Sequence, residues 1–205
     1  MSARSPLVAV PMRVEAGLVR RGAPAWEIER IGIGPRRASA AGERIAPCLH
    51  GRPVLVLGFA GALDEQLAVG DVVIASRLLA EGEQPLDVPG GAALQGALEA
   101  AGLRARLGPV FCARRPVLGA RRTRLHESSG AIAVEMESIF LARALSAAPF
   151  VVRVISDGVR RGRPSPLGAF LSFLEARRVL RAAAGALAGA PELLAHAAGS
   201  ERRID

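Results

Sequence analysis

The chain has 205 residues, which is enough for one domain with a substantial core, and its formal net charge is +8. All 27 basic residues are arginine, and the chain has no lysine, asparagine or tyrosine, which indicates GC-rich coding rather than a binding partner. The arginine pairs are dispersed and aromatic residues make up only 3% of the chain, so a nucleic-acid-binding protein is the least favoured class.

Apolar runs alternate with segments of helical spacing along the chain, which predicts an α/β fold with a sheet buried between helix layers. Strands are expected at residues 7–10, 26–34, 53–63, 70–76, 106–112, 131–134 and 149–155. Helices are expected after the first strand and at residues 35–50, 91–103, 136–147 and 166–188, and a long loop at residues 80–92. We expect one domain over residues 1–198 and a frayed tail over residues 199–205.

Targeting and metal signals are weak. The apolar runs are broken well before the roughly 18–20 residues that a membrane span needs, so we expect no stable membrane insertion. The N-terminus lacks the apolar stretch of a secretory signal, so a cytoplasmic location is expected. Cys48 and Cys112 are expected to be small buried residues, and the three histidines are scattered singly, so no metal site is predicted.

Polar residues or glycines stand where four predicted strands end, and such ends form the active-site edge of α/β sheets. These places are Glu15, Gly58–Gly61, Glu135–Glu137 and Ser156–Asp157. Carboxylates that converge in a desolvated cleft have their pKa values pushed apart, which allows separate acid and base roles. Taken singly each place also has a structural explanation, such as first-turn acids that complement a helix dipole at Glu135–Glu137.

Arg153 lies inside an apolar predicted strand. A buried arginine requires an acidic partner, and Glu15 and Glu137 are the two candidates.

Three segments in order resemble the nucleoside phosphorylase and nucleosidase superfamily, the purine and uridine phosphorylase type. They are "GFAGALDEQLAVGDVVIAS" (58–76), "AVEMES" (133–138) and "VVRVISD" (151–157), with a carboxylate after the first strand. The resemblance covers about residues 7–157. It implies a single-domain, three-layer α/β/α fold with a central mixed, partly barrel-like sheet, and cleavage of the N-ribosidic bond of a purine nucleoside.

For the sugar, the resemblance implies that Glu137 accepts hydrogen bonds from the ribose 2′- and 3′-hydroxyls, because a carboxylate suits a vicinal diol. Met136 would pack against the sugar face, with Glu135 nearby. Gly58 and Gly61 would allow backbone N–H groups to approach the nucleophile or the sugar without obstruction.

For the base and the nucleophile, the resemblance implies that Asp157 protonates the departing base, that Ser156 orients Asp157, and that Glu15 activates water. Bond cleavage leaves positive charge on the sugar and negative charge on the base, so an acid at the base and carboxylates near the sugar suit the reaction. The remaining expected substrate contacts are Phe59, Ala60, Val117 and Arg153.

Water and phosphate are alternative nucleophiles. Phosphorolysis needs cations for a dianion, and Arg13 and Arg36 are the candidates, although both also fit solvated helix faces. Glu15 favours water because a carboxylate at the nucleophile site repels phosphate. No metal or organic cofactor is expected, with phosphate a co-substrate only in the phosphorylase alternative, and the family implies a homo-oligomer.

The sequence departs from the family pattern at the base site. Phe59 stands where a small hydroxyl residue is usual in methylthioadenosine nucleosidases, and Pro116 and Val117 stand where an aromatic and an aliphatic residue are expected. The short chain, the base-loop segment 112–125 and the segment "RVISDGVRRGRPSP" (153–166) look more like the branch associated with hopanoid lipid synthesis, which removes adenine from an adenosyl-lipid. A non-catalytic nucleoside-binding homologue is the remaining alternative.

Overall fold

The structure, a computed structural model, describes residues 5–88, 90–159 and 166–194. The predicted tail at residues 199–205 lies outside the described residues. The strands are β1 (Leu7–Val10), β2 (Glu27–Arg30), β3 (Val54–Ala62), β4 (Val72–Leu79), β5 (Leu86–Asp87), β6 (Ala105–Cys112), β7 (Ala133–Glu135) and β8 (Phe150–Asp157). The helices are α1 (Arg13–Gly22), α2 (Pro35–Ile45), the 3-10 helix η1 (Ala46–Cys48), α3 (Gly91–Ala100), α4 (Ala120–Ser129), α5 (Ser138–Leu145) and α6 (Pro166–Ala188).

Five strands close into a ring. β3 pairs with β8 in parallel, β8 with β4 in antiparallel, β4 with β6 and β6 with β7 in parallel, and β7 with β3 in antiparallel. β1 and β2 extend the sheet from the first half of β3, and β5 pairs with β4. The predicted mixed, partly barrel-like sheet is therefore confirmed.

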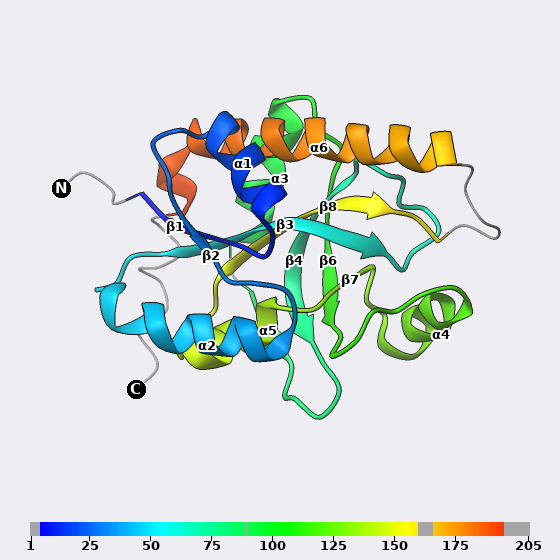
Figure 1. Cartoon of the computed structure of the whole chain (residues 1–205), viewed down its shortest axis with the longest axis horizontal. Helices are drawn as coiled ribbons and strands as arrows, with labels where there is room; N and C mark the ends of the chain where they lie inside the picture. Colours follow the sequence, from blue (N-terminus) through cyan, green and yellow to red (C-terminus); the bar gives the residue numbers. More distant parts are fainter. Residues whose placement is uncertain (1–4, 89, 160–165, 195–205) are drawn as a thin grey trace.

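Helices cover the sheet on two sides. Figure 1 shows α1, α3 and α6 above the sheet and α2 and α5 below it. Because successive side chains of a strand point to opposite faces, Leu55 and Leu57 of β3 pack in one apolar cluster and Val54 and Val56 in the other. This arrangement confirms the three-layer α/β/α prediction. No helix in the described part of the chain is both long and apolar enough to cross a membrane.

Several local predictions were wrong. The α-helix expected at residues 35–50 ends at Ile45, because Pro47 has no N–H to donate and the chain continues as the 3-10 helix η1. The expected loop at residues 80–92 contains the short strand β5. The segment 112–125 contains the start of α4, which was not predicted. Cys48 is exposed, whereas Cys112 is buried as expected.

The glycines of β3 were also misplaced. Gly58 and Gly61 were expected where the third predicted strand ends, but both lie inside β3, which is buried along its whole length. The pairing of β3 with β8 shifts register between Ala60 and Gly61. A bulge of this kind bends a strand, so β3 can pair with β8 along one edge and with β1 and then β7 along the other.

Candidate active site

A pocket of about 280 Å³ opens where β3, β7 and β8 end. Most of the residues predicted from the strand ends line it together. They are Glu15, Phe59, Ala60, Gly61, Val117, Glu135, Met136, Glu137, Ser156 and Asp157. Pro11, Met12, Ile33, Arg115, Pro116, Leu118, Arg122 and Val134 complete the lining. The pocket therefore has apolar walls and four carboxylates from three separate segments of the chain.

Glu15 is held at the start of α1. Its Oε2 accepts a hydrogen bond from the backbone N–H of Met12 at 2.6 Å, as a glutamate in the first turn does when it caps its own helix. Its Oε1 accepts from the N–H of Phe59 in β3 at 2.7 Å. Burial raises the pKa of Glu15, and Arg153 acts in the opposite direction. Glu15 is therefore a fixed, desolvated carboxyl group on the pocket wall.

Glu135 caps the helix that follows it. Its carboxylate accepts hydrogen bonds from the backbone N–H groups of Glu137 and Ser138, at 3.1 and 3.0 Å, and from the Ser138 hydroxyl at 2.9 Å. Burial acts to raise the pKa of Glu135, but the guanidinium of Arg153 and the hydrogen bonds from Ser138 and Cys112 hold it below its usual value. Glu135 therefore acts as the helix-capping acid of α5.

Glu137 does not cap its own helix. It occupies the N-cap position of α5 without a side-chain cap, and its Oε1 instead accepts from the N–H of Gly34, at the N-cap of α2, at 2.9 Å. Burial and the neighbouring Glu135 raise the pKa of Glu137 to about 7. The first-turn-acid explanation therefore applies to Glu135 and not to Glu137.

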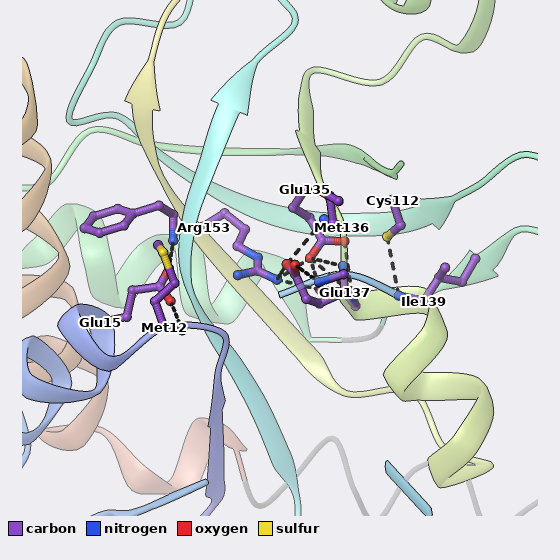
Figure 2. Close-up of polar contacts among 11 residues, drawn as sticks. Met12, Glu15, Cys112, Glu135, Met136, Glu137, Ile139 and Arg153 are labelled. Atoms are coloured by element: carbon purple, nitrogen blue, oxygen red, sulfur yellow. Dashed lines mark hydrogen bonds and ion pairs between the residues drawn. The ribbon is translucent and has the colours of Figure 1, made fainter. Parts of the chain in front are cut away.

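Arg153 sits beneath the pocket as the centre of this cluster. Its side chain is fully buried, forms its shortest ion pair with Glu135, and lies 3.5 Å from Glu137. Figure 2 shows its guanidinium directed toward these two residues, with Glu15 on the opposite side. Of the two expected partners, Glu137 is confirmed as an ion-pair partner of Arg153, but the shortest ion pair is with Glu135, which was not predicted. Arg153 is absent from the pocket lining and supports the site from below.

Gly58 makes this cluster possible. A Cβ atom at this position would lie 2.5 Å from Glu15 Oε1 and 2.8 Å from Arg153 Nη1. Both charged groups therefore occupy the space that a side chain would fill. The sequence reasoning assigned Gly58 to backbone contact with the nucleophile or sugar, but the structure uses its missing side chain to seat Glu15 beside Arg153.

Three buried carboxyl groups share this one guanidinium. If Glu15, Glu135 and Glu137 were all ionised beside Arg153, the cluster would carry a net charge of −2 in a desolvated interior, which is unfavourable. The structure relieves this by raising the pKa values of Glu15 and Glu137 while Glu135 stays ionised. Glu15 and Glu137 are thus more easily protonated than Glu135.

Asp157 lies on the other side of the pocket, at the end of β8. Its side chain is 54% exposed, and its Oδ1 accepts a hydrogen bond from the Ser156 hydroxyl at 3.0 Å. This contact agrees with the expectation that Ser156 orients Asp157. The carboxylate faces space that a ligand can enter.

Arg122 is a site residue that the sequence reasoning missed. It comes from α4, lines the pocket, and forms an ion pair with Asp157. The sequence around it, "ARRTRL", contains several arginines and no feature that separates this one from its neighbours. Only its position in the fold distinguishes it.

The two arginines expected near phosphate do not reach the pocket. Arg13 is exposed at the start of α1 and Arg36 lines a separate hollow with Arg114 and Phe140. The structure therefore does not bring either candidate phosphate ligand to the carboxylates.

Comparison with solved structures shows the same fold. The 5′-methylthioadenosine/S-adenosylhomocysteine nucleosidase of Helicobacter pylori, solved with butyl-thio-DADMe-Immucillin-A, has a TM-score of 0.73 and 17% identity, covering 91% of this chain and 97% of that chain. The futalosine hydrolase of Helicobacter pylori has a TM-score of 0.73 and 16% identity, covering 90% and 96%. The nucleosidase of Neisseria meningitidis, solved with methylthio-immucillin-A, has a TM-score of 0.70 and 21% identity, covering 89% and 96%.

A search of curated protein sequences finds no match. A family model described as the phosphorylase superfamily matches residues 13–190, which is most of the chain and includes every carboxylate of the pocket. The resemblance inferred from the three sequence segments is confirmed, and the chain belongs to the phosphorylase superfamily.

Proposed function

We propose that this protein cleaves the N-ribosidic bond of a purine nucleoside with water and releases the base. The observation that carries the proposal is the placement of Glu15, Glu137 and Asp157 around one apolar-walled pocket, in three different electrostatic environments. Cleavage of this bond separates charge between sugar and base, so it needs carboxylates near the sugar and a proton donor at the base.

Glu15 is the proposed base that activates water. Its oxygens are fixed by two backbone N–H groups, and burial raises its pKa, which makes the carboxylate a stronger proton acceptor than a solvated glutamate. Nη1 of Arg153 and Oε1 of Glu15 both border the space where a Cβ of residue 58 would lie, and this Nη1 has no hydrogen-bond partner among the described residues. Its positive charge favours the ionised form of Glu15 during the reaction.

Glu137 is the proposed ligand of the ribose hydroxyls, and Asp157 the proposed acid at the base. Oε1 of Glu137 accepts a hydrogen bond from Gly34 at 2.9 Å, whereas Oε2 makes two longer contacts, at 3.3 Å with the Met136 N–H and at 3.5 Å with Nη2 of Arg153, so Oε2 is the freer oxygen for a diol. Met136 lines the pocket beside it and offers an apolar surface to the sugar.

The proposed leaving group is adenine. The substrate class fits a nucleoside with an apolar 5′ substituent, of the methylthioadenosine or adenosyl-lipid type, because Met12, Ile33 and Leu118 line the pocket and Phe59 contacts Phe173 of α6. Phe59 thus links the pocket to the first turns of α6, where Phe170 and Leu171 are exposed.

Phosphorolysis is the second candidate. Arg115 and Arg122 are the arginines of the pocket lining, and Arg122 is already paired with Asp157. A phosphate dianion would therefore meet one unengaged lining arginine and the carboxylates of Glu15 and Glu137, and this balance favours water.

The test is adenine release from adenosine and from 5′-methylthioadenosine, with and without phosphate, using sulfate at equal ionic strength as the control. The sulfate control is needed because a chain of net charge +8 attracts anions non-specifically. We expect release that does not depend on phosphate and that yields a free sugar. Glu15→Gln should abolish release but retain adenine binding, while the exposed Glu65→Gln should behave as the parent.

Two outcomes would contradict the proposal. Release that requires phosphate, survives Glu15→Gln and fails in Arg115→Ala would identify a phosphorylase. Adenine binding without release from either nucleoside under any condition would favour a non-catalytic binding homologue. The absence of a cofactor, the homo-oligomeric state and the cytoplasmic location remain predictions. Light scattering measures the oligomeric state.

A further inference from the structure

α4 is attached to the barrel in an unusual way. Helices normally dock through an apolar stripe, but the only buried residue of α4 is Arg122, and the rest of the helix is half-buried or exposed. The segment just before α4, residues 115–118, forms one wall of the pocket. Val117 of this wall and Leu125 of α4 pack against a small buried apolar cluster, and the contacts of Arg122 provide a second, polar attachment.

Arg122 binds the end of β8 and the wall at the same time. Its Nε donates to the carbonyl of Val117 at 2.9 Å, and its Nη1 lies 3.3 Å from the carbonyl oxygens of both Asp157 and Gly158. Its Nη2 donates to Oδ2 of Asp157. One planar guanidinium thus connects the pocket wall to both the backbone and the carboxylate of Asp157.

Gly61 provides the space for this guanidinium. A Cβ atom at Gly61 would lie 2.7 Å from Nη2 of Arg122. In the sheet, Gly61 is the register partner of Asp157, directly after the bulge in the pairing of β3 and β8. The glycine, the arginine and the aspartate therefore form one packed unit, contributed by β3, α4 and β8.

We infer that Arg122 is a positioning residue for the base end of the pocket, acting through Asp157. This inference rests on the proposed function, since it assumes that Asp157 meets the departing base. Asp157 is 54% exposed and, apart from Arg122, only the Ser156 hydroxyl contacts its carboxylate among the described residues. A guanidinium held by three carbonyls keeps the Asp157 carboxylate in one orientation. It also fixes the position of residues 115–118 beside that carboxylate.

The fork geometry of the arginine is essential to this role. Lysine has a single ammonium and cannot reach the Val117 carbonyl, the carbonyls of Asp157 and Gly158 and the Asp157 carboxylate at once. Methionine keeps much of the volume and removes every donor. Because Asp157 is half exposed, water can solvate it when Arg122 is removed, so these variants should still fold.

The experiment compares Arg122→Met, Arg122→Lys and the exposed control Arg121→Gln in adenine release. We expect Arg122→Met to lower kcat/KM by roughly ten- to a hundredfold, mostly in kcat, because misplacing a catalytic group by about 1 Å has an effect of this size. Arg122→Lys should recover only part of the loss, and Arg121→Gln should match the parent. Full activity in Arg122→Met would overturn the inference.

Two further variants test whether Arg122 acts through Asp157. Gly61→Ala should reproduce the loss seen in Arg122→Met, because its Cβ displaces the guanidinium. In the Asp157→Asn background, Arg122→Met should lower the rate of adenine release by a much smaller factor than in the parent, because the carboxylate that Arg122 positions is already absent. If the double variant instead loses activity by the product of the two single-variant factors, Arg122 acts independently of Asp157, and this result would contradict the inference.

Hydrogen exchange separates failure of this inference from failure of the proposed function. Exchange of the backbone amides in residues 117–129 should accelerate in Arg122→Met relative to the parent and to Arg121→Gln, whether or not the protein releases adenine. If the parent releases no adenine but this acceleration is seen, the proposed function fails and the positioning contact stands. Unchanged exchange in Arg122→Met would refute the positioning contact itself.

Discussion

At the residue scale, four carboxylates of the pocket have four different environments. Glu135 is fully engaged by Arg153 and the start of α5, and Glu15 is fixed by two backbone N–H groups. Glu137 is buried with a pKa of about 7, whereas Asp157 is half exposed and paired with Arg122. Identical functional groups therefore receive separate roles from their surroundings, as is typical of acid–base sites.

The first prediction concerns Asp157. Asp157→Asn keeps the size of the side chain and a hydrogen-bond acceptor for Arg122, but it removes the proposed proton donor. We expect the rate of adenine release to fall by about 10²–10⁴-fold, with the melting temperature nearly unchanged. Steady-state kinetics and a thermal melt measure the two effects. Turnover close to that of the parent would remove Asp157 from the mechanism.

At the element scale, β3 carries the site because two of its residues lack side chains. A strand interior normally disfavours glycine, which has no side chain to pack. In β3, Gly58 and Gly61 instead leave space for the charged groups of Glu15, Arg153 and Arg122.

A second prediction follows for Gly58. Gly58→Ala places a methyl group 2.5 Å from Glu15 Oε1, so the carboxylate must leave its position beside Arg153. We expect a loss of about 2–4 kcal/mol in the free energy of unfolding, of the size seen when a buried charge network is broken. Urea denaturation measures this loss.

The matched control is Gly96→Ala in α3. This glycine is exposed, lies inside a helix and has open space where a Cβ would be. Alanine should stabilise the protein by about 0.5–1 kcal/mol because it has the higher helix propensity. Equal effects of the two substitutions would show that the Gly58 position has no special packing requirement.

At the scale of the whole molecule, ring closure brings the acidic cluster into the interior. β7 supplies Glu135, β8 supplies Arg153, and β3 lies between them and α1, which carries Glu15. The fold therefore buries more negative than positive charge at this point. The stability of the whole molecule becomes linked to the protonation of that cluster.

This linkage gives a third prediction. The pKa of Glu137 rises from 4.5 to about 7 on folding, so between these values the folded protein binds more protons than the unfolded chain, and the free energy of unfolding falls as pH rises. Glu137→Gln removes this contribution. Between pH 5 and pH 8, the parent should lose about 2–3 kcal/mol more than the variant.

Urea denaturation at a series of pH values measures this difference. The exposed Glu65→Gln should follow the parent curve, because its carboxyl group does not enter the cluster. Parallel pH curves for the parent and Glu137→Gln would contradict the assigned protonation of Glu137.

Much of the architecture could be predicted from the sequence because its signals are local. The apolar run of β3, the Pro35 start of α2 and the helical spacing of α6 each depend on a few neighbouring residues. The polar strand ends also pointed to one sheet edge, so Glu15, Glu137 and Asp157 could be grouped before their distances were known. α4 was missed because its polar, arginine-rich sequence has no apolar stripe to mark it.

The amino-acid order alone thus determined the fold class, the order of the strands and helices other than β5, η1 and α4, and the set of carboxylates at the pocket. The tertiary structure decided which groups pair. It assigned Arg153 to Glu135, Arg122 to Asp157, and the space at Gly58 to Glu15. The physical reason is that an ion pair depends on where two side chains meet after ring closure, and residues 18 or 35 positions apart carry no local signal of that meeting.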